Sequence, residues 1–190
     1  TIQTQNPSQF LRQILADYKS PRFDYLPSFT GGFVGYFSYD YLGYKEPTVR
    51  TNIPDTDVFK DLDLMLFDKV IAFDNFRQKM ILIVNMPLTN LEIEYKKAIQ
   101  ELKQMQNLLT FGKKKAEPNG HLTGEITPLF DRQTYCRMVE QAKHHIHEGD
   151  IFQIVLSNRF HASFEGSLLN TYRILRTINP SPYMFYFSGT

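Results

Sequence analysis

The chain has 190 residues, enough for one sizeable hydrophobic core or two small ones. Its 21 basic and 20 acidic residues leave a formal net charge of +1, which excludes a strong electrostatic attraction to nucleic acid or to an anionic membrane. The single cysteine, Cys136, excludes an internal disulfide and suits a reducing, cytoplasmic compartment. No apolar run approaches the roughly 20 residues that are needed to span a bilayer.

The first predicted element is an amphipathic helix over residues 7–19, capped by Asn6 and opened by Pro7. The aromatic run that follows, PSFTGGFVGYFSYDYLGYKEP, predicts a strand interrupted by glycines. Glycines inside a strand indicate either a bulge or the close approach of another backbone. A phosphate-binding loop would also need a lysine and a following helix, which this stretch lacks.

Residues 48–61 are predicted to form a polar, acidic surface loop. The spacing of its aspartates lacks the glycine and the terminal glutamate of a calcium-binding loop. Two apolar runs follow, over residues 62–73 and 80–84, with turn-forming residues between them. This pattern predicts a β-hairpin over residues 62–85.

Two long amphipathic helices are predicted after the hairpin. The first covers residues 91–111 and is followed by an exposed loop over residues 112–125. The second covers residues 134–147, is capped by Asp131 and ends at Gly149, a residue type that readily adopts the left-handed conformation.

The last part of the chain predicts a strand over 151–160, a helix over 168–178 and a strand over 183–187. The prolines of NPSP make the entry into the final strand rigid and extended. The histidines of the KHHIH run lack the spacing of a helical metal-binding pair, so we expect them to be surface residues near a helix C-terminus.

Four stretches carry a family resemblance, and they occur in the same order as in that family: FTGGFVGYFSYDYLGYKEP, LDLMLFDKVIAFD, YCRMVEQAKHHIHEGDIFQIVLSNRF and YRILRTINPSPYMFYF. Together they resemble the anthranilate synthase component I family of chorismate-utilising enzymes. The resemblance implies an α+β fold, a layered antiparallel β-sandwich with outer helices, of which this chain is a part. Residues 1–124 would be an N-terminal-type portion, and residues 125–190 would begin the chorismate-binding domain.

The sequence has no initial methionine and stops directly after an apolar run, so we expect it to be a piece of a longer protein. The resemblance implies that the N-terminal segment and the C-terminal half of the family's proteins lie outside it. We therefore expect exposed apolar faces and, for the isolated chain, no catalysis.

The resemblance also implies a reaction. A lyase of this family adds ammonia to chorismate and eliminates pyruvate, which leaves anthranilate for tryptophan biosynthesis. A partner, the glutamine amidotransferase component II, supplies the ammonia, and tryptophan inhibits the enzyme by feedback. Magnesium holds the chorismate carboxylate, and its ligands are expected outside these 190 residues. Neither nucleic acid nor a membrane is implied as a partner.

Gln153 is the candidate catalytic residue. Its position resembles that of a lysine that acts as general base in relatives that add water to chorismate. A glutamine cannot take up a proton at neutral pH, which fits a branch that adds ammonia, itself a competent nucleophile. The alternative is a strand amide whose hydrogen bonds go to neighbouring backbone.

Residues Asn179, Pro182, Tyr183 and Met184 are the candidate inhibitor-binding residues. The NPSPYM stretch to which they belong resembles part of a tryptophan pocket. Its prolines restrict the backbone in advance, which lowers the entropy lost on binding. The alternative is a stiff strand entry with core aromatic residues.

Two other functions remain open at this stage. The 4-amino-4-deoxychorismate synthases of the folate pathway share the glutamine and the NPSPYM stretch. Their family carries a nucleophilic lysine in a Pro-Ile-Lys-Gly-Thr stretch that would lie beyond Thr190. The chain by itself could instead be a non-catalytic binding module.

Overall fold

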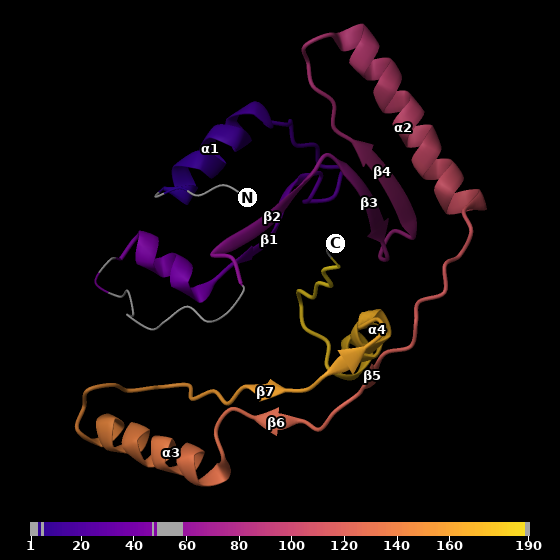
Figure 1. Cartoon of the computed structure of the whole chain (residues 1–190). Coiled ribbons are helices and arrows are strands. Elements are labelled where there is room, and N and C mark those ends of the chain that lie inside the picture. Colours follow the sequence, from indigo (N-terminus) through magenta and orange to yellow (C-terminus); the bar gives the residue numbers. More distant parts are fainter. Residues whose placement is uncertain (1–3, 5, 47, 49–58, 189–190) are drawn as a thin grey trace. The chain divides into compact units, whose positions relative to one another are not determined.

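A computed structural model describes residues 4, 6–46, 48 and 59–188. The chain divides into two compact units, Thr1–Lys113 and Lys114–Thr190, and each is described by itself (Figure 1). The predicted domain boundary after residue 124 lies inside the second unit, because β5 (His121–Leu122) pairs with β8 (Phe164–Glu165) there. Most of the predicted acidic loop, residues 49–58, lies outside the described residues.

Among its described residues the first unit contains two α-helices, one 3₁₀ helix and two antiparallel strand pairs, in agreement with the predicted α+β class. Helix α1 (Pro7–Asp17) begins where the Asn6 side chain accepts a hydrogen bond from the backbone N–H of Gln9. Strand β1 (Gly32–Phe37) pairs with β2 (Leu62–Phe67), and a 3₁₀ helix, Tyr39–Tyr44, follows β1. Strand β3 (Lys69–Asp74) pairs with β4 (Lys79–Val84), and α2 (Leu91–Phe111) matches its predicted range.

The predicted strand over residues 62–73 was wrong, because the chain leaves one sheet at Asp68 and enters another. The carbonyl of Asp68 accepts hydrogen bonds from the backbone N–H of Asn85, at 2.8 Å, and from its side-chain amide, at 3.1 Å. The same Asn85 amide donates to the carbonyl of Thr30 at 2.7 Å. One half-buried side chain therefore joins the entry to β1, the junction of β2 with β3 and the end of β4.

The predicted close approach of backbones at the β1 glycines is confirmed at Gly35. This residue lies opposite Leu64 of β2. A Cβ atom at position 35 would overlap the backbone carbonyl oxygen of Asp63. Because that contact is with backbone, a side chain there could be accommodated only by moving the strands apart.

The second unit contains two helices and two very short strand pairs. Besides the β5–β8 pair, β6 (Thr127–Pro128) pairs with β7 (Phe160–His161). Helix α3 (Arg132–His147) begins at the predicted cap, Asp131, whose carboxylate accepts from the Thr134 N–H at 2.7 Å. The predicted Gly149 follows shortly after its last residue and, with φ of +82°, turns the chain out of the helix. Helix α4 (Leu169–Ile178) occupies most of its predicted range.

Two predicted strands of the second unit were wrong. Residues 151–159 are irregular and only Phe160 belongs to a strand, and residues 183–187 are also irregular. Backbone becomes a strand only when a neighbouring strand pairs with it. Within the part of the chain that the structure describes, neither 151–158 nor 180–188 makes a backbone–backbone hydrogen bond, so each remains an unpaired segment.

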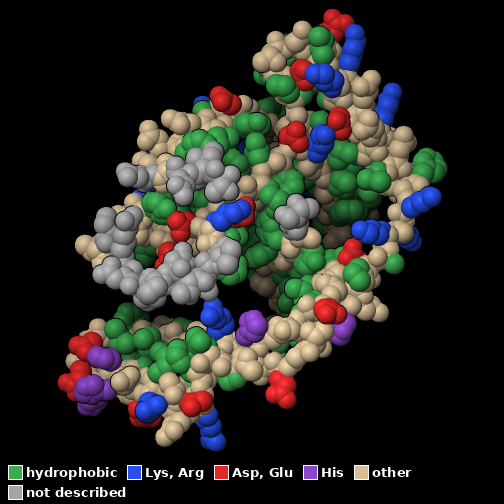
Figure 2. All heavy atoms as spheres, viewed as in Figure 1, with side chains coloured by type: hydrophobic (Ala, Val, Ile, Leu, Met, Phe, Trp, Pro, Cys, Tyr) green, Lys and Arg blue, Asp and Glu red, His purple; other side chains and the backbone are tan. Residues whose placement is uncertain are grey.

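Hydrophobic side chains are mostly exposed, as predicted. Among the described residues the buried hydrophobic ones are Ile83, Ala98 and Ala142. Ile83 of β4 and Ala98 of α2 mark the small core of the first unit, where this helix packs on this strand. The chain exposes 17093 Å², whereas a folded protein of this mass exposes about 9,400 Å². Figure 2 shows hydrophobic side chains over much of the visible surface.

The Gly35 contact predicts that replacing this residue with alanine separates β1 from β2. We expect Gly35→Ala to lower the free energy of unfolding by about 1–3 kcal/mol, as overpacking typically does. Urea titration followed by circular dichroism measures this change. Gly124→Ala is the matched control, since a Cβ there would come no closer than 3.8 Å to another side chain. Equal stability of the two variants would contradict the packing described.

The Asp131 cap predicts a pH-dependent α3. Hydrogen bonds from the backbone N–H and then the hydroxyl of Thr134 hold the pKa of Asp131 below its ordinary value of 3.8. Because the folded pKa is the lower one, this stabilisation is present above pH 3.8 and is lost as the pH falls through the folded value. Asp131→Asn keeps a capping oxygen but does not titrate.

The thermal midpoints of the wild type and Asp131→Asn, compared at several pH values, test this expectation. We expect the wild type to be the more stable at pH about 6 and its advantage to shrink toward pH about 3. A difference that stays constant over this range would show that the Asp131 carboxylate is not linked to folding.

Candidate functional site

The segment that carries Gln153 begins at a tightly closed helix end. The N–H of Gly149 donates to the carbonyl of Ile146 at 3.2 Å, and the N–H of Asp150 donates to that of His145 at 3.0 Å. The His145 ring nitrogen Nδ1 also lies 2.8 Å from a carboxylate oxygen of Asp150. These contacts turn the chain back along α3 at Asp150 (Figure 1).

The far end of this segment is fixed to the beginning of α3. The Asn158 side-chain oxygen accepts from the N–H of Phe130 at 3.0 Å, and its amide donates to the carbonyl of the same residue at 2.9 Å. The hydroxyl of Tyr135 donates to the carbonyl of Leu156 at 3.2 Å. The extended segment 151–157 is thus held at both ends against one helix.

Gln153 lies between these two anchors and is exposed. No hydrogen bond joins its amide to another residue among those that the structure describes. Phe152 and Val155 beside it are 94% and 83% exposed, whereas Ile151 and Leu156 are half-buried. Gln153 therefore stands on an open surface with its amide free for another partner.

The four candidate inhibitor-binding residues occupy the end of α4 and the segment after it. Asn179 ends the helix, and its N–H donates to the carbonyl of Leu175 at 2.9 Å. Pro182 is exposed and Tyr183 is 92% exposed, whereas Met184 is half-buried.

After Met184 the chain returns along α4, in the same manner in which residues 151–157 return along α3. The ring of Tyr186 lies 5.7 Å from that of Tyr172 in α4. This contact fixes the end of the segment, while Tyr183 at its beginning stays free of the helix. Across the described ranges, no hydrogen bond, ion pair or ring contact joins Gln153 to residues 179–184, so the structure does not assemble these candidates into one site.

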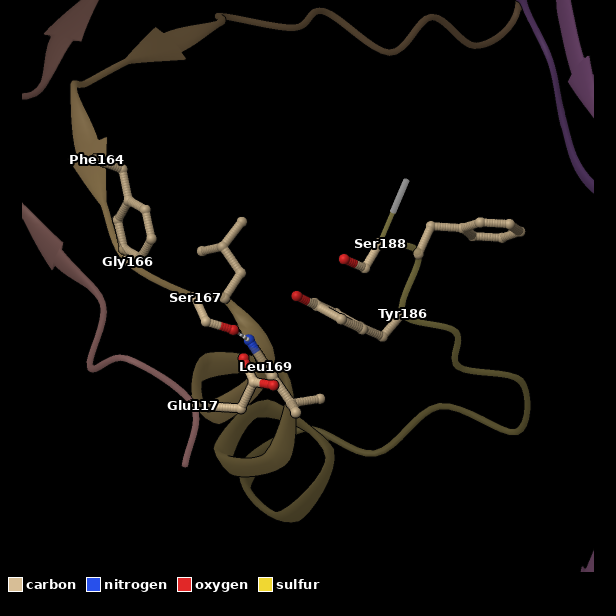
Figure 3. Close-up of a pocket in the computed structure, with 9 residues that line it drawn as sticks. Glu117, Phe164, Gly166, Ser167, Leu169, Tyr186 and Ser188 are labelled. Carbon is tan, nitrogen blue, oxygen red and sulfur yellow. Dashed lines mark hydrogen bonds between the residues drawn. The ribbon is translucent and has the colours of Figure 1, made fainter. Parts of the chain in front are cut away.

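An open hollow of about 390 Å³ lies beside the beginning of α4 (Figure 3). Phe164 and Tyr186 stand on either side of it in this view, and Ser167 accepts a hydrogen bond from the N–H of Leu169 at 3.2 Å. None of the predicted site residues lines it. Both polar and apolar groups line the hollow, and the hollow is open to solvent, so it does not indicate a ligand class.

In the described part of the chain, no group of three or more His, Cys, Asp or Glu residues is placed to hold a metal ion. His145 is engaged with Asp150, and His144 lies 3.9 Å from Glu148. These residues do not fit a magnesium site, which needs convergent carboxylates. The described helices also include none long and apolar enough to cross a bilayer.

Sequence reasoning missed the residues that fix the Gln153 segment. Asn158 and Tyr135 are separated from their partners by 28 and 21 residues. An asparagine in an apolar run favours a turn or a local cap, and nothing in the pattern indicates a paired contact with Phe130. Only the fold of α3 against the returning segment reveals this contact.

Comparison with known proteins places the chain in a family. The profile of the chorismate binding enzyme family matches residues 1–190. Anthranilate synthase component 1 of Acetivibrio thermocellus is 34% identical over 95% of this chain and 38% of its own length. The protein of the same name from Acinetobacter calcoaceticus is 35% identical over 97% of this chain and 37% of its own length.

A solved structure agrees with these relatives. The crystal structure of anthranilate synthase component I from Streptococcus pneumoniae TIGR4 superimposes with a TM-score of 0.71 at 29% identity. It covers 95% of this chain, and the match takes up 40% of that chain. The chain thus spans well under half of the length of these relatives, and it belongs to the chorismate binding enzyme family.

Proposed function

We propose that this chain supplies part of an anthranilate synthase component I, which converts chorismate and ammonia to anthranilate and pyruvate. The observation that supports this proposal most strongly is similarity over 95% or more of the chain to relatives of that name. The solved structure of the same name supports it independently through its fold. Tryptophan biosynthesis is the pathway that such a product serves.

The proposal concerns the natural polypeptide that contains this chain. The three relatives described above are covered to only 37–40% of their length. The paired but narrow sheets of both units and their exposed apolar side chains fit a layered β-sandwich that is completed by further strands. We propose that a glutamine amidotransferase supplies ammonia to this polypeptide.

In the proposed reaction, Gln153 orients a reactant and does not take up a proton. Its amide carries one acceptor oxygen and two donor hydrogens and has no basic site at neutral pH. Ammonia needs no general base to become a nucleophile, so an orienting amide suffices. Support comes from the exposed position of Gln153 on a segment that is anchored on both sides of it.

Magnesium is proposed as the ion that holds the chorismate carboxylate in the natural polypeptide. Among the residues that the structure describes, no group of three or more His, Cys, Asp or Glu residues is placed to hold this ion.

Feedback inhibition by tryptophan is proposed to involve Asn179, Pro182, Tyr183 and Met184. Exposed aromatic and apolar side chains after a rigid proline segment form a surface suited to an indole ring.

The isolated chain is expected to be inactive, because it holds the Gln153 segment without convergent metal ligands in its described part. We expect the natural polypeptide, given chorismate, ammonium and magnesium, to form anthranilate, and the isolated 190 residues to form none. Anthranilate fluorescence measures both. Fluorescent product from the isolated chain would contradict its expected inactivity. The absence of product from the natural polypeptide would contradict the proposed function.

The inhibitor proposal is tested by Met184→Ala in the natural polypeptide. We expect about a tenfold higher tryptophan concentration for half inhibition, since truncating a buried apolar contact weakens binding by roughly 1.4 kcal/mol or more. The Michaelis constant for chorismate should change little. Met138→Ala, on α3, is the control, and equal tryptophan sensitivity of the two variants would remove Met184 from the pocket.

A further inference from the structure

We propose that Asn158 is a positioning residue for the segment that carries Gln153, and that it acts by pairing with the backbone of Phe130. The proposal rests on the proposed function, since it assigns Asn158 a role in the same reaction. It adds a residue that no part of the sequence pattern singles out.

The Asn158 side chain imitates a paired strand. In an antiparallel pair, two residues exchange an N–H donor and a carbonyl acceptor with each other. Asn158 does so with its carboxamide, which accepts from the Phe130 N–H at 3.0 Å and donates to the Phe130 carbonyl at 2.9 Å. Both polar groups of one backbone residue are thereby satisfied by one half-buried side chain.

This contact extends the short β6–β7 pair at its open end. Thr127 lies opposite His161, and Pro128 lies opposite Phe160. The N–H of Leu129 then donates to the carbonyl of Arg159 at 2.7 Å. The Asn158 pair supplies two further bonds at the point where the segment leaves its partner and begins to run along α3.

The geometry of the segment makes this end important for Gln153. Helix α3 has 16 residues, which corresponds to a length of about 24 Å. The segment from Asp150 to Asn158 returns over that helix, and nine extended residues reach roughly 30 Å. The segment therefore has little slack, and the position of Gln153 depends on both anchors.

The two anchors differ in strength. At Asp150 the chain is held by its N–H bond to His145 and by the contact of its carboxylate with the His145 ring. At the other end the hydroxyl of Tyr135 makes a single bond to the Leu156 carbonyl, at 3.2 Å. Removing the Asn158 carboxamide would leave the Leu129–Arg159 bond and the Tyr135 bond to hold this end of the segment, so the position of Gln153 would become less well defined.

A matched control exists in the first unit. Asn85 is also half-buried and also ties backbone carbonyls, those of Thr30 and Asp68, through its side-chain amide. Its hydrogen-bond partners among the described residues are Ser20, Thr30 and Asp68, which all belong to the first unit. A variant at Asn85 therefore reports what the loss of a structural asparagine does to activity in general.

The test is a pair of double-mutant cycles in the natural polypeptide, with anthranilate formation as the readout. Asn158→Ala and Asn85→Ala are each combined with Gln153→Ala. We expect Asn158→Ala to lower kcat/KM about tenfold, since it removes two hydrogen bonds. In the Gln153→Ala background the same change should lower it less than about twofold, because the residue that Asn158 positions is gone. Asn85→Ala should have the same effect in both backgrounds.

Two further variants keep the test decisive if Asn158→Ala folds poorly. Asn158→Asp preserves size and the acceptor for the Phe130 N–H but places a carboxylate oxygen against the Phe130 carbonyl, so the same loss is expected. Tyr135→Phe removes one bond of the same anchor, and a smaller loss in the same direction is expected. Hydrogen exchange of the Phe130 N–H, which donates to the Asn158 side chain, should be faster in Asn158→Ala than in the wild type.

The outcomes separate the two proposals. A wild type that forms no anthranilate removes the proposed function and the role of Asn158 with it. An active wild type in which Asn158→Ala gives the same loss in both backgrounds shows that Asn158 is only structural, which overturns this inference alone. An unchanged activity of Gln153→Ala also overturns it, while leaving the proposed function in place.

Discussion

Backbone pairing is the constraint on which the whole structure depends. Extended segments become strands only where a neighbour supplies hydrogen-bond partners. Four two-stranded sheets meet this condition among the described residues. Residues 151–158 and 180–188 do not, and each instead lies along the helix that precedes it. Asparagine side chains, Asn85 in the first unit and Asn158 in the second, supply paired contacts where the sheets end.

Local signals made most elements predictable from the sequence. Side-chain caps and apolar periodicity predicted the helices, and the glycines of the first strand pattern indicated the close approach of two strands at Gly35. These features depend on residues that are close in the sequence. The break at Asp68 could not be predicted, because its cause is the distant Asn85. The strands 151–160 and 183–187 were predicted from apolar composition, which indicates burial but does not supply the partner strand.

For the candidate site, too, some residues were suggested by the sequence and other contacts are seen only in the fold. The family resemblance led to Gln153, Asn179, Pro182, Tyr183 and Met184, and the structure shows their exposure without testing their roles. The contacts that hold the Gln153 segment, through Asn158 and Tyr135, come from the fold alone. An amide on a taut, exposed segment is suited to orienting a neutral nucleophile. It is not suited to removing a proton.

The central claim is that the natural polypeptide adds ammonia to chorismate and releases pyruvate. Mass spectrometry of the product formed from chorismate and ¹⁵N-labelled ammonium, with pyruvate measured in parallel, tests it most directly. We expect ¹⁵N-anthranilate and an equal amount of pyruvate. An unlabelled hydroxylated product, or labelled 4-amino-4-deoxychorismate with no pyruvate, would contradict it.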